Sequence, residues 1–203
     1  MKILRSIQYK PSPIKGGYSD KILRVDLVSK TITTLQLAPG FKEKYIGGRG
    51  YALKLIWDMT SNKTRYDSPE NLLVMAGGPL CSDPRFPGSG KFIVGTISPL
   101  TDTFIDSNVG GHFAPLLKLC GFDALAVSGI SRGEVVLIVD GDEGRISIAE
   151  VPVFGEEVDS GSLSYGEALL KEFNDGVLNE NCAAVTFGIG ARHTRFGIIN
   201  SLF

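Results

Sequence analysis

Cysteine and histidine are scarce in this chain of 203 residues, with three of the former and two of the latter. Cys81, Cys120 and Cys182 are far apart, and their odd number argues against a disulfide-stapled fold. Together with His112 and His193 they show no spacing typical of metal ligands. We therefore interpret the cysteines as buried structural thiols rather than as a metal centre.

Long apolar runs and an excess of either charge are also missing. No segment approaches the ~20 apolar residues that cross a bilayer. The basic segment 1–10 has too short an apolar stretch for a secretory signal. A formal net charge of -1 gives no indication of a nucleic-acid or membrane-surface partner. The composition, 43% hydrophobic and 21% charged, predicts a globular protein with a normal core. The N-terminal segment without the features of a secretory signal predicts a cytoplasmic location.

Two segments match only part of a nucleotide-binding motif, and neither motif is complete. Gly188–His193 starts like a dinucleotide fingerprint but has His193 where close helix packing requires glycine. Gly90-Lys91 resembles the end of a P-loop, yet Arg85 replaces its first glycine and Phe92 its magnesium-binding hydroxyl.

Glycine, in contrast, is abundant at 25 residues, against a usual share of about 7%. The most informative cluster is Asn108, Gly110 and Gly111, because it opens onto apolar residues with the period of a helix: Phe113, Leu116, Leu117 and Cys120. A helix that begins after paired glycines offers free N–H groups to an anion such as phosphate. The glycines at 88 and 90, followed by Lys91, suit the same ligand. A hairpin turn before an ordinary core helix explains the pattern equally well.

The hydrophobic periodicities predict an α+β fold, because strands and helices do not alternate in a βαβ order. A hairpin is expected from Lys21–Leu27 and Thr31–Leu37. The other expected strands are 72–76, 92–97, 124–128, 135–139, 145–151, 183–187 and 196–199. Helical segments are expected at 41–46, 50–59, with Leu53, Ile56 and Trp57 on one side, and 164–173. Residues 1–16 are expected to be an N-terminal extension, a surface-bound or mobile arm, before one domain at 17–203.

Eight short segments carry a resemblance to a known family through their order along the chain: Lys21–Leu27, Tyr45–Gly50, Asp67–Asn71, Gly77–Leu80, Gly88–Lys91, Ser98–Thr101, Asp106–Gly111 and Gly121–Ala124. This order resembles the N-terminal domain of the tungsten-containing aldehyde:ferredoxin oxidoreductases. The resemblance implies a mixed and antiparallel sheet domain of unusual topology. It also implies a tungsten (or molybdenum) bis-molybdopterin cofactor, whose metal is held by pterin sulfurs rather than by the protein.

The resemblance assigns cofactor contacts residue by residue. Asn108 matches the residue whose backbone carbonyl holds a magnesium ion bridging the two pterin phosphates, and Gly110 and Gly111 match a close backbone approach. Lys91 stands where members usually have arginine, and Arg49 lies between two glycines of a matching segment. Each residue also has an ordinary interpretation. Asn108 suits a turn, and Gly110 and Gly111 suit the entry into a helix. Lys91 could be solvated, and Arg49 could form a surface ion pair.

The resemblance places other parts of such an enzyme outside this sequence. The 4Fe-4S cluster would lie in a missing domain or partner, with ferredoxin or an iron-sulfur subunit accepting electrons. No catalytic residue is assigned here, and the chain is not expected to be active alone. A companion subunit or a homo-oligomer is expected. The departures at Lys91, and at Ala191 where members commonly have glutamate, leave open a scaffold or assembly subunit without cofactor.

Overall fold

The computed structural model describes residues 2–151, 161–174, 176, 181–195 and 199–202. Its largest element is a six-stranded sheet with the order β3-β2-β7-β4-β5-β6. These strands are β2 (Lys21–Asp26), β3 (Thr31–Gln36), β4 (Leu72–Ala76), β5 (Phe92–Ile97), β6 (Phe104–Val109) and β7 (Ala124–Ser128). Only β2 and β7 run parallel among them, so the expected α+β fold with a mixed sheet is confirmed.

A second sheet of three antiparallel strands includes the first residues of the chain. Its order is β1-β9-β8, with β1 (Ile3–Gln8), β8 (Val135–Asp140) and β9 (Arg145–Glu150). The side chains of Leu4, Ile7 and Tyr9 pack against the main core. The start of the chain is therefore a built strand rather than a mobile arm, while the proposed boundary at residue 16 stays a prediction.

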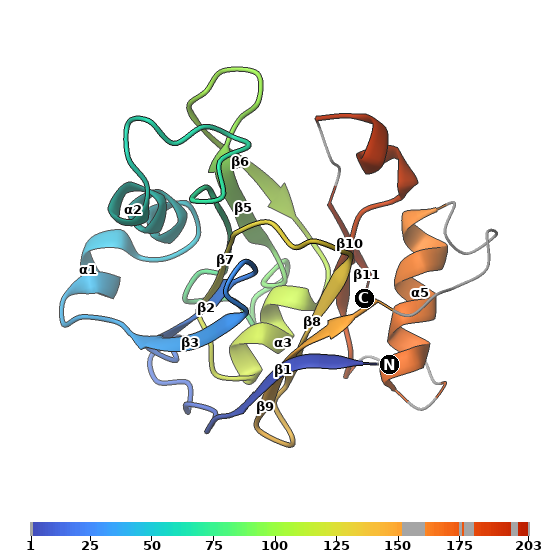
Figure 1. Ribbon diagram of the computed structural model, residues 1–203. Coiled ribbons are helices and arrows are strands. Elements are labelled where there is room, and N and C mark those ends of the chain that lie inside the picture. The colour runs from blue at the N-terminus through green and yellow to red at the C-terminus, as the bar shows by residue number, and fades with distance from the viewer. Residues whose placement is uncertain (1, 152–160, 175, 177–180, 196–198, 203) are drawn as a thin grey trace.

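Two hydrophobic cores lie on opposite faces of the six-stranded sheet. Helices α1 (Phe41–Tyr45) and α2 (Arg49–Met59) cover one face, where Tyr51, Ala52 and Ile56 are buried. Helix α3 (Phe113–Leu119) lies on the other face, in a core that the three-stranded sheet completes (Figure 1). Burial on both faces explains why β4 and β7 are almost continuously apolar.

The remaining described elements lie near the C-terminus. Helix α5 (Ser162–Phe173) packs on a two-stranded sheet of β10 (Ala184–Thr186) and β11 (Asn200–Leu202), and η1 (Ile189–His193) precedes β11. The strand expected at 196–199 lies mostly outside the described residues. None of the helices that the structure describes has both the length and the apolar character needed to cross a bilayer.

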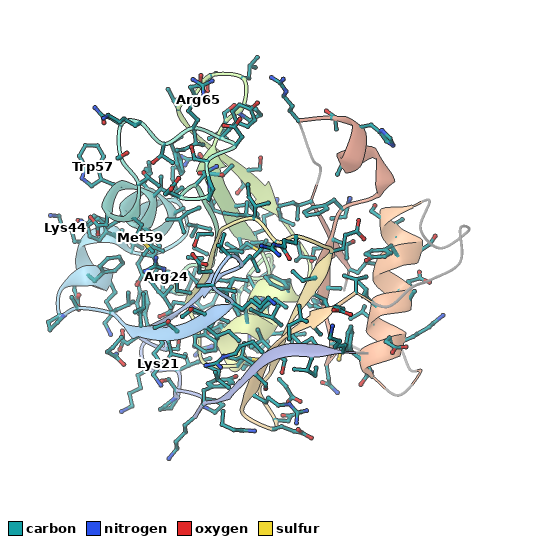
Figure 2. All side chains as sticks on the ribbon, viewed as in Figure 1. Lys21, Arg24, Lys44, Trp57, Met59 and Arg65 are labelled. Atoms are coloured by element: carbon teal, nitrogen blue, oxygen red, sulfur yellow. The ribbon has the colours of Figure 1, made fainter. Side chains whose placement is uncertain are left out.

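Besides β1, which lies in the predicted N-terminal extension, the sequence misjudged one helix face and one strand. On α2, Leu53 is 43% and Trp57 82% exposed, whereas Ile56 is buried, so these residues do not share the core side. Figure 2 shows Trp57 standing away from the body of the protein. The whole of β6 was missed, because its polar and exposed residues are those of a sheet edge and lack a buried apolar alternation.

A buried ion pair joins the segments around the sheet. The ammonium of Lys118, on α3, lies 3.4 Å from the carboxylate of Asp123, and neither side chain is more than 2% exposed. Lys118 also donates hydrogen bonds to the carbonyl oxygens of Gly17 (2.7 Å) and Gly78 (2.6 Å). The Asp123 carboxylate accepts from the backbone N–H groups of Ser19 and Asp20. One pair thus holds together α3, the segment before β2 and the loop after β4.

Replacing Lys118 by methionine is expected to lower the free energy of unfolding by about 3–5 kcal/mol, since it leaves the Asp123 carboxylate buried without its cation. Urea denaturation measures this loss. The matched control is Lys2→Met, which breaks the exposed pair with Glu150 and should cost under about 1 kcal/mol. Equal losses in the two variants would contradict the central role of the buried pair.

Candidate functional site

Several glycine-containing loops meet at one end of the six-stranded sheet. In the antiparallel register Ala76, the last residue of β4, pairs with Ile93, and Phe92 pairs with Val109, the last residue of β6. The loops that follow β4 and β6 and that precede α2 and β5 are therefore neighbours. We call this region the glycine edge, defined by Gly47, Gly48, Gly77, Gly78, Gly88, Gly90, Gly110 and Gly111.

Some of these glycines are required by contacts between the loops. The backbone N–H of Gly48 donates to the carbonyl of Gly77 at 2.8 Å, and a Cβ atom on Gly47 would lie 2.7 Å from that same oxygen. A Cβ atom on Gly90 would lie 2.5 Å from the carbonyl oxygen of Gly111. Such distances exclude any side chain, so glycine is needed here for packing alone.

Other glycines of the edge have no internal reason to be glycine. A Cβ atom on Gly78 or Gly110 would meet nothing within 4 Å among the described residues. Neither residue has the left-handed backbone that favours glycine, in contrast to Gly111 with φ of +92°. An open backbone that stays without side chains fits a site where an external group approaches closely.

A bidentate ion pair joins the start of α2, directly after Gly48, to the middle of β6. Arg49 is the first residue of α2, and its Nε and Nη2 atoms donate to the two carboxylate oxygens of Asp106 at 2.9 Å each. Asp106 lies in β6, two residues before Asn108, so both side chains are on the same face of the strand. Helix α2 covers that face, since a Cβ atom on Gly95, the register partner of Asp106, would lie 2.8 Å from the Cβ of Ala52.

The remaining residues predicted from the sequence lie at the same end of the sheet. Asn108 is exposed on the edge strand β6 and pairs in register with Ile93. Lys91 directly precedes β5, is exposed, and has no ion pair with any described residue. An unpaired cation, a paired arginine and open backbone together suit an anionic ligand.

Helix α3 contributes less to this site than its sequence suggested. It has seven residues. His112 occupies the N-cap position, but its side chain makes no capping hydrogen bond to the first turn. The dipole of so short a helix is small. Any attraction for an anion here would therefore come mainly from the loop backbone and from Lys91 and Arg49.

The family comparison agrees with the segments that build this edge. Residues 22–201 match the family model described as "Aldehyde ferredoxin oxidoreductase, N-terminal domain". The chain belongs to the aldehyde ferredoxin oxidoreductase family. The resemblance to the N-terminal domain of this family, which the order of the eight segments predicted, is confirmed.

Named relatives are similar over most of this chain but are much longer. The tungsten-containing aldehyde ferredoxin oxidoreductases of Pyrococcus horikoshii and Pyrococcus abyssi are each 35% identical to it over 156 residues, which is 77% of this chain. The aligned part is 24% of either relative, so the chain spans about a quarter of their length.

A solved structure has the same fold. The active site complex BamBC of Benzoyl Coenzyme A reductase, in complex with 1,5 Dienoyl-CoA, superposes with a TM-score of 0.74 at 31% identity. The match covers 90% of this chain and 25% of that one. Two kinds of enzyme named for different substrates therefore share the domain described here.

The structure brings the residues predicted from the sequence to one region, and it adds two partners that the sequence did not indicate. Arg49, Lys91, Asn108, Gly110 and Gly111 all lie at or beside the glycine edge, although their contacts with a cofactor stay a prediction. Asp106 and Lys118 were not identified as partners. A lysine within an apolar helix segment was the available signal for the second, since buried lysines are almost always paired.

The described residues contain no group of three or more histidine, cysteine, aspartate or glutamate side chains that could hold a metal ion. All three cysteines are free thiols; Cys81 is buried, and Cys120 and Cys182 are partly buried. Their role as structural thiols stays a prediction.

The thiol of Cys120 is expected to react slowly with alkylating reagents. Burial raises its pKa to about 11, so that at pH 8 roughly one thiol in a thousand is the reactive thiolate. Iodoacetamide labelling followed by mass spectrometry should give a rate that rises about tenfold per pH unit from pH 8 to 10. Labelling in urea is the control, and equal rates in the folded and unfolded chain at pH 8 would contradict the burial of this thiol.

Proposed function

We propose that this chain forms the cofactor-cradling N-terminal part of a tungsten or molybdenum bis-molybdopterin oxidoreductase that oxidises aldehydes to carboxylic acids. The observation that carries the proposal is the open backbone at Gly78 and Gly110, which keeps no side chain although the fold would accept one. Membership of the family and the names of the relatives support the choice of cofactor.

The described residues fit the phosphate groups of such a cofactor. The backbone of Gly110 and Gly111 would approach the phosphates, and Lys91 would neutralise their charge as a point cation. Arg49 would offer the N–H groups that its pair with Asp106 leaves free. The backbone carbonyl of Asn108 would help to hold a magnesium ion, which would supply positive charge to the phosphates.

In this role the chain binds and orients, and it performs no proton or electron transfer itself. The bound metal-pterin group supplies the two-electron chemistry of aldehyde oxidation. We propose that the remaining domains or a companion subunit hold a 4Fe-4S centre, which would supply electron transfer, and that ferredoxin is their partner. We propose the cytoplasm as the location of the assembled enzyme.

A second candidate is a scaffold or assembly subunit that keeps the fold without the cofactor. Two departures favour it: Lys91 replaces the usual arginine, and Ala191 replaces a usual glutamate. Lysine cannot form the bidentate contact with phosphate that arginine forms. Cofactor content distinguishes the two candidates.

Replacing Gly110 by valine tests the cradle directly. The side chain meets no described atom within 4 Å and φ is not left-handed, so the chain should fold normally. The pterin content of the complex assembled with its natural partners should fall at least about tenfold, because valine occupies the space of the ligand. Pterin is measured by fluorescence after oxidative release.

The matched control is Gly133→Val, since a Cβ atom at Gly133 also meets nothing within 4 Å but lies just before β8, away from the glycine edge. This variant should keep the full pterin content. Wild-type pterin content in the Gly110→Val complex would refute the assigned contact.

A further inference from the structure

Asp106 is a charged residue at the glycine edge for which an anion site has no evident use. A carboxylate beside a phosphate repels it, at a cost that grows as water is excluded. Yet the Asp106 side chain is only 15% exposed and is fully engaged by Arg49, whose side chain is 63% exposed. The burial of one partner and the exposure of the other suggest that Asp106 acts through Arg49.

The geometry of the pair leaves half of the arginine available. A guanidinium group carries five N–H donors, arranged on two edges that can each bind two oxygens. Asp106 occupies the edge formed by Nε and Nη2. The other edge, formed by Nη1 and the second hydrogen of Nη2, has no partner among the described residues.

A purely structural task for Asp106 explains part of this arrangement. Arg49 is at the N-terminus of α2, where the helix dipole repels a cation, and the first turn of α2 contains no acidic residue. A carboxylate nearby offsets that repulsion in any orientation. The two-point contact goes further, because it also fixes the rotation of the guanidinium group.

We propose that Asp106 is a positioning residue for anion binding, which locks Arg49 with its second N–H edge turned to a phosphate at the glycine edge. The proposal rests on the anion site of the proposed function and extends it. In this arrangement the charge of Asp106 weakens the electrostatic attraction for the anion. In return, Asp106 holds Arg49 in the orientation that a two-point contact with the anion needs.

The sign of one substitution separates positioning from simple electrostatics. Removing the negative charge with Asp106→Asn should strengthen anion binding if charge alone matters. If Asp106 positions Arg49, the same substitution should weaken binding, because the guanidinium is no longer held. In an Arg49→Met background nothing is left to position, so Asp106→Asn should then cause no loss.

The experiment is a calorimetric titration of the full chain with inorganic pyrophosphate at low, constant salt. Relative to the wild type, Arg49→Met should weaken binding about tenfold and Asp106→Asn about three- to tenfold, as expected for losing charge-assisted hydrogen bonds. The double variant should bind no more weakly than Arg49→Met alone, because the charge that it also removes only repels the anion. Asp102→Asn is the control, since it removes an exposed carboxylate that pairs with Arg65, and it should leave the affinity unchanged.

Unchanged or tighter binding by Asp106→Asn would overturn the positioning role while leaving the anion site intact. An equal loss in both backgrounds would also overturn it, because Asp106 would then act without Arg49. If the wild type binds no pyrophosphate, or Gly110→Val binds it as well as the wild type, the proposed function fails and the inference fails with it.

A second measurement needs no variant that has to fold. In the wild type the Nε–H of Arg49 should give a resolved NMR signal that exchanges slowly with water, since it is held by Asp106. An Nε–H of Arg49 that exchanges as fast in the folded chain as in the urea-unfolded chain would contradict a locked guanidinium.

Discussion

The ammonium of Lys118 and the carboxylate of Asp123 lie 3.4 Å apart where water does not reach either side chain. Burying two charges is costly, and the gain comes only when the remaining donors and acceptors are also satisfied. Here they are, because Lys118 bonds the carbonyls of Gly17 and Gly78 while Asp123 accepts two backbone N–H groups. The loop that carries Gly78 is thereby fixed, and it fixes the loop before α2 through the bond from Gly48 to Gly77.

This support explains how the glycine edge keeps a defined shape with so few side chains. Loops without side chains have high conformational entropy when free. Here the loops are ordered by contacts with the rest of the fold. These contacts are the buried pair, the strand register of β4, β5 and β6, and the bond between Arg49 and Asp106. The open positions at Gly78 and Gly110 are therefore held in place rather than loose, which is what preorganised binding of a large anionic group requires.

The sequence predicted the elements whose apolar residues repeat with a clear period, and β4, β5 and β7 were predicted with their observed bounds. It failed where partners distant in sequence decide the outcome. Strand β6 is held by pairing with β5 and has no buried stripe of its own. The face of α2 was misjudged because Leu53 and Trp57 are apolar but exposed, and only the packing shows this. Asp106 pairs with a residue 57 positions away, which no local spacing indicates.

Membership of the family does not by itself determine the substrate. The relatives are named as aldehyde ferredoxin oxidoreductases, while the solved complex with the same fold is a Benzoyl Coenzyme A reductase. In the function that we propose, this chain would contact the anionic part of a cofactor rather than the substrate, so that one cradle could serve different reactions.

The central claim is that this chain holds a metal-pterin cofactor, and the most direct measurement is the metal and pterin content of the native complex. The complex would be captured through this chain from its own source, with tungsten and molybdenum measured by mass spectrometry and pterin by fluorescence after release. If the chain holds the cofactor, the complex should contain pterin together with tungsten or molybdenum in stoichiometric amounts. An intact complex that contains neither would contradict it and identify the chain as a scaffold.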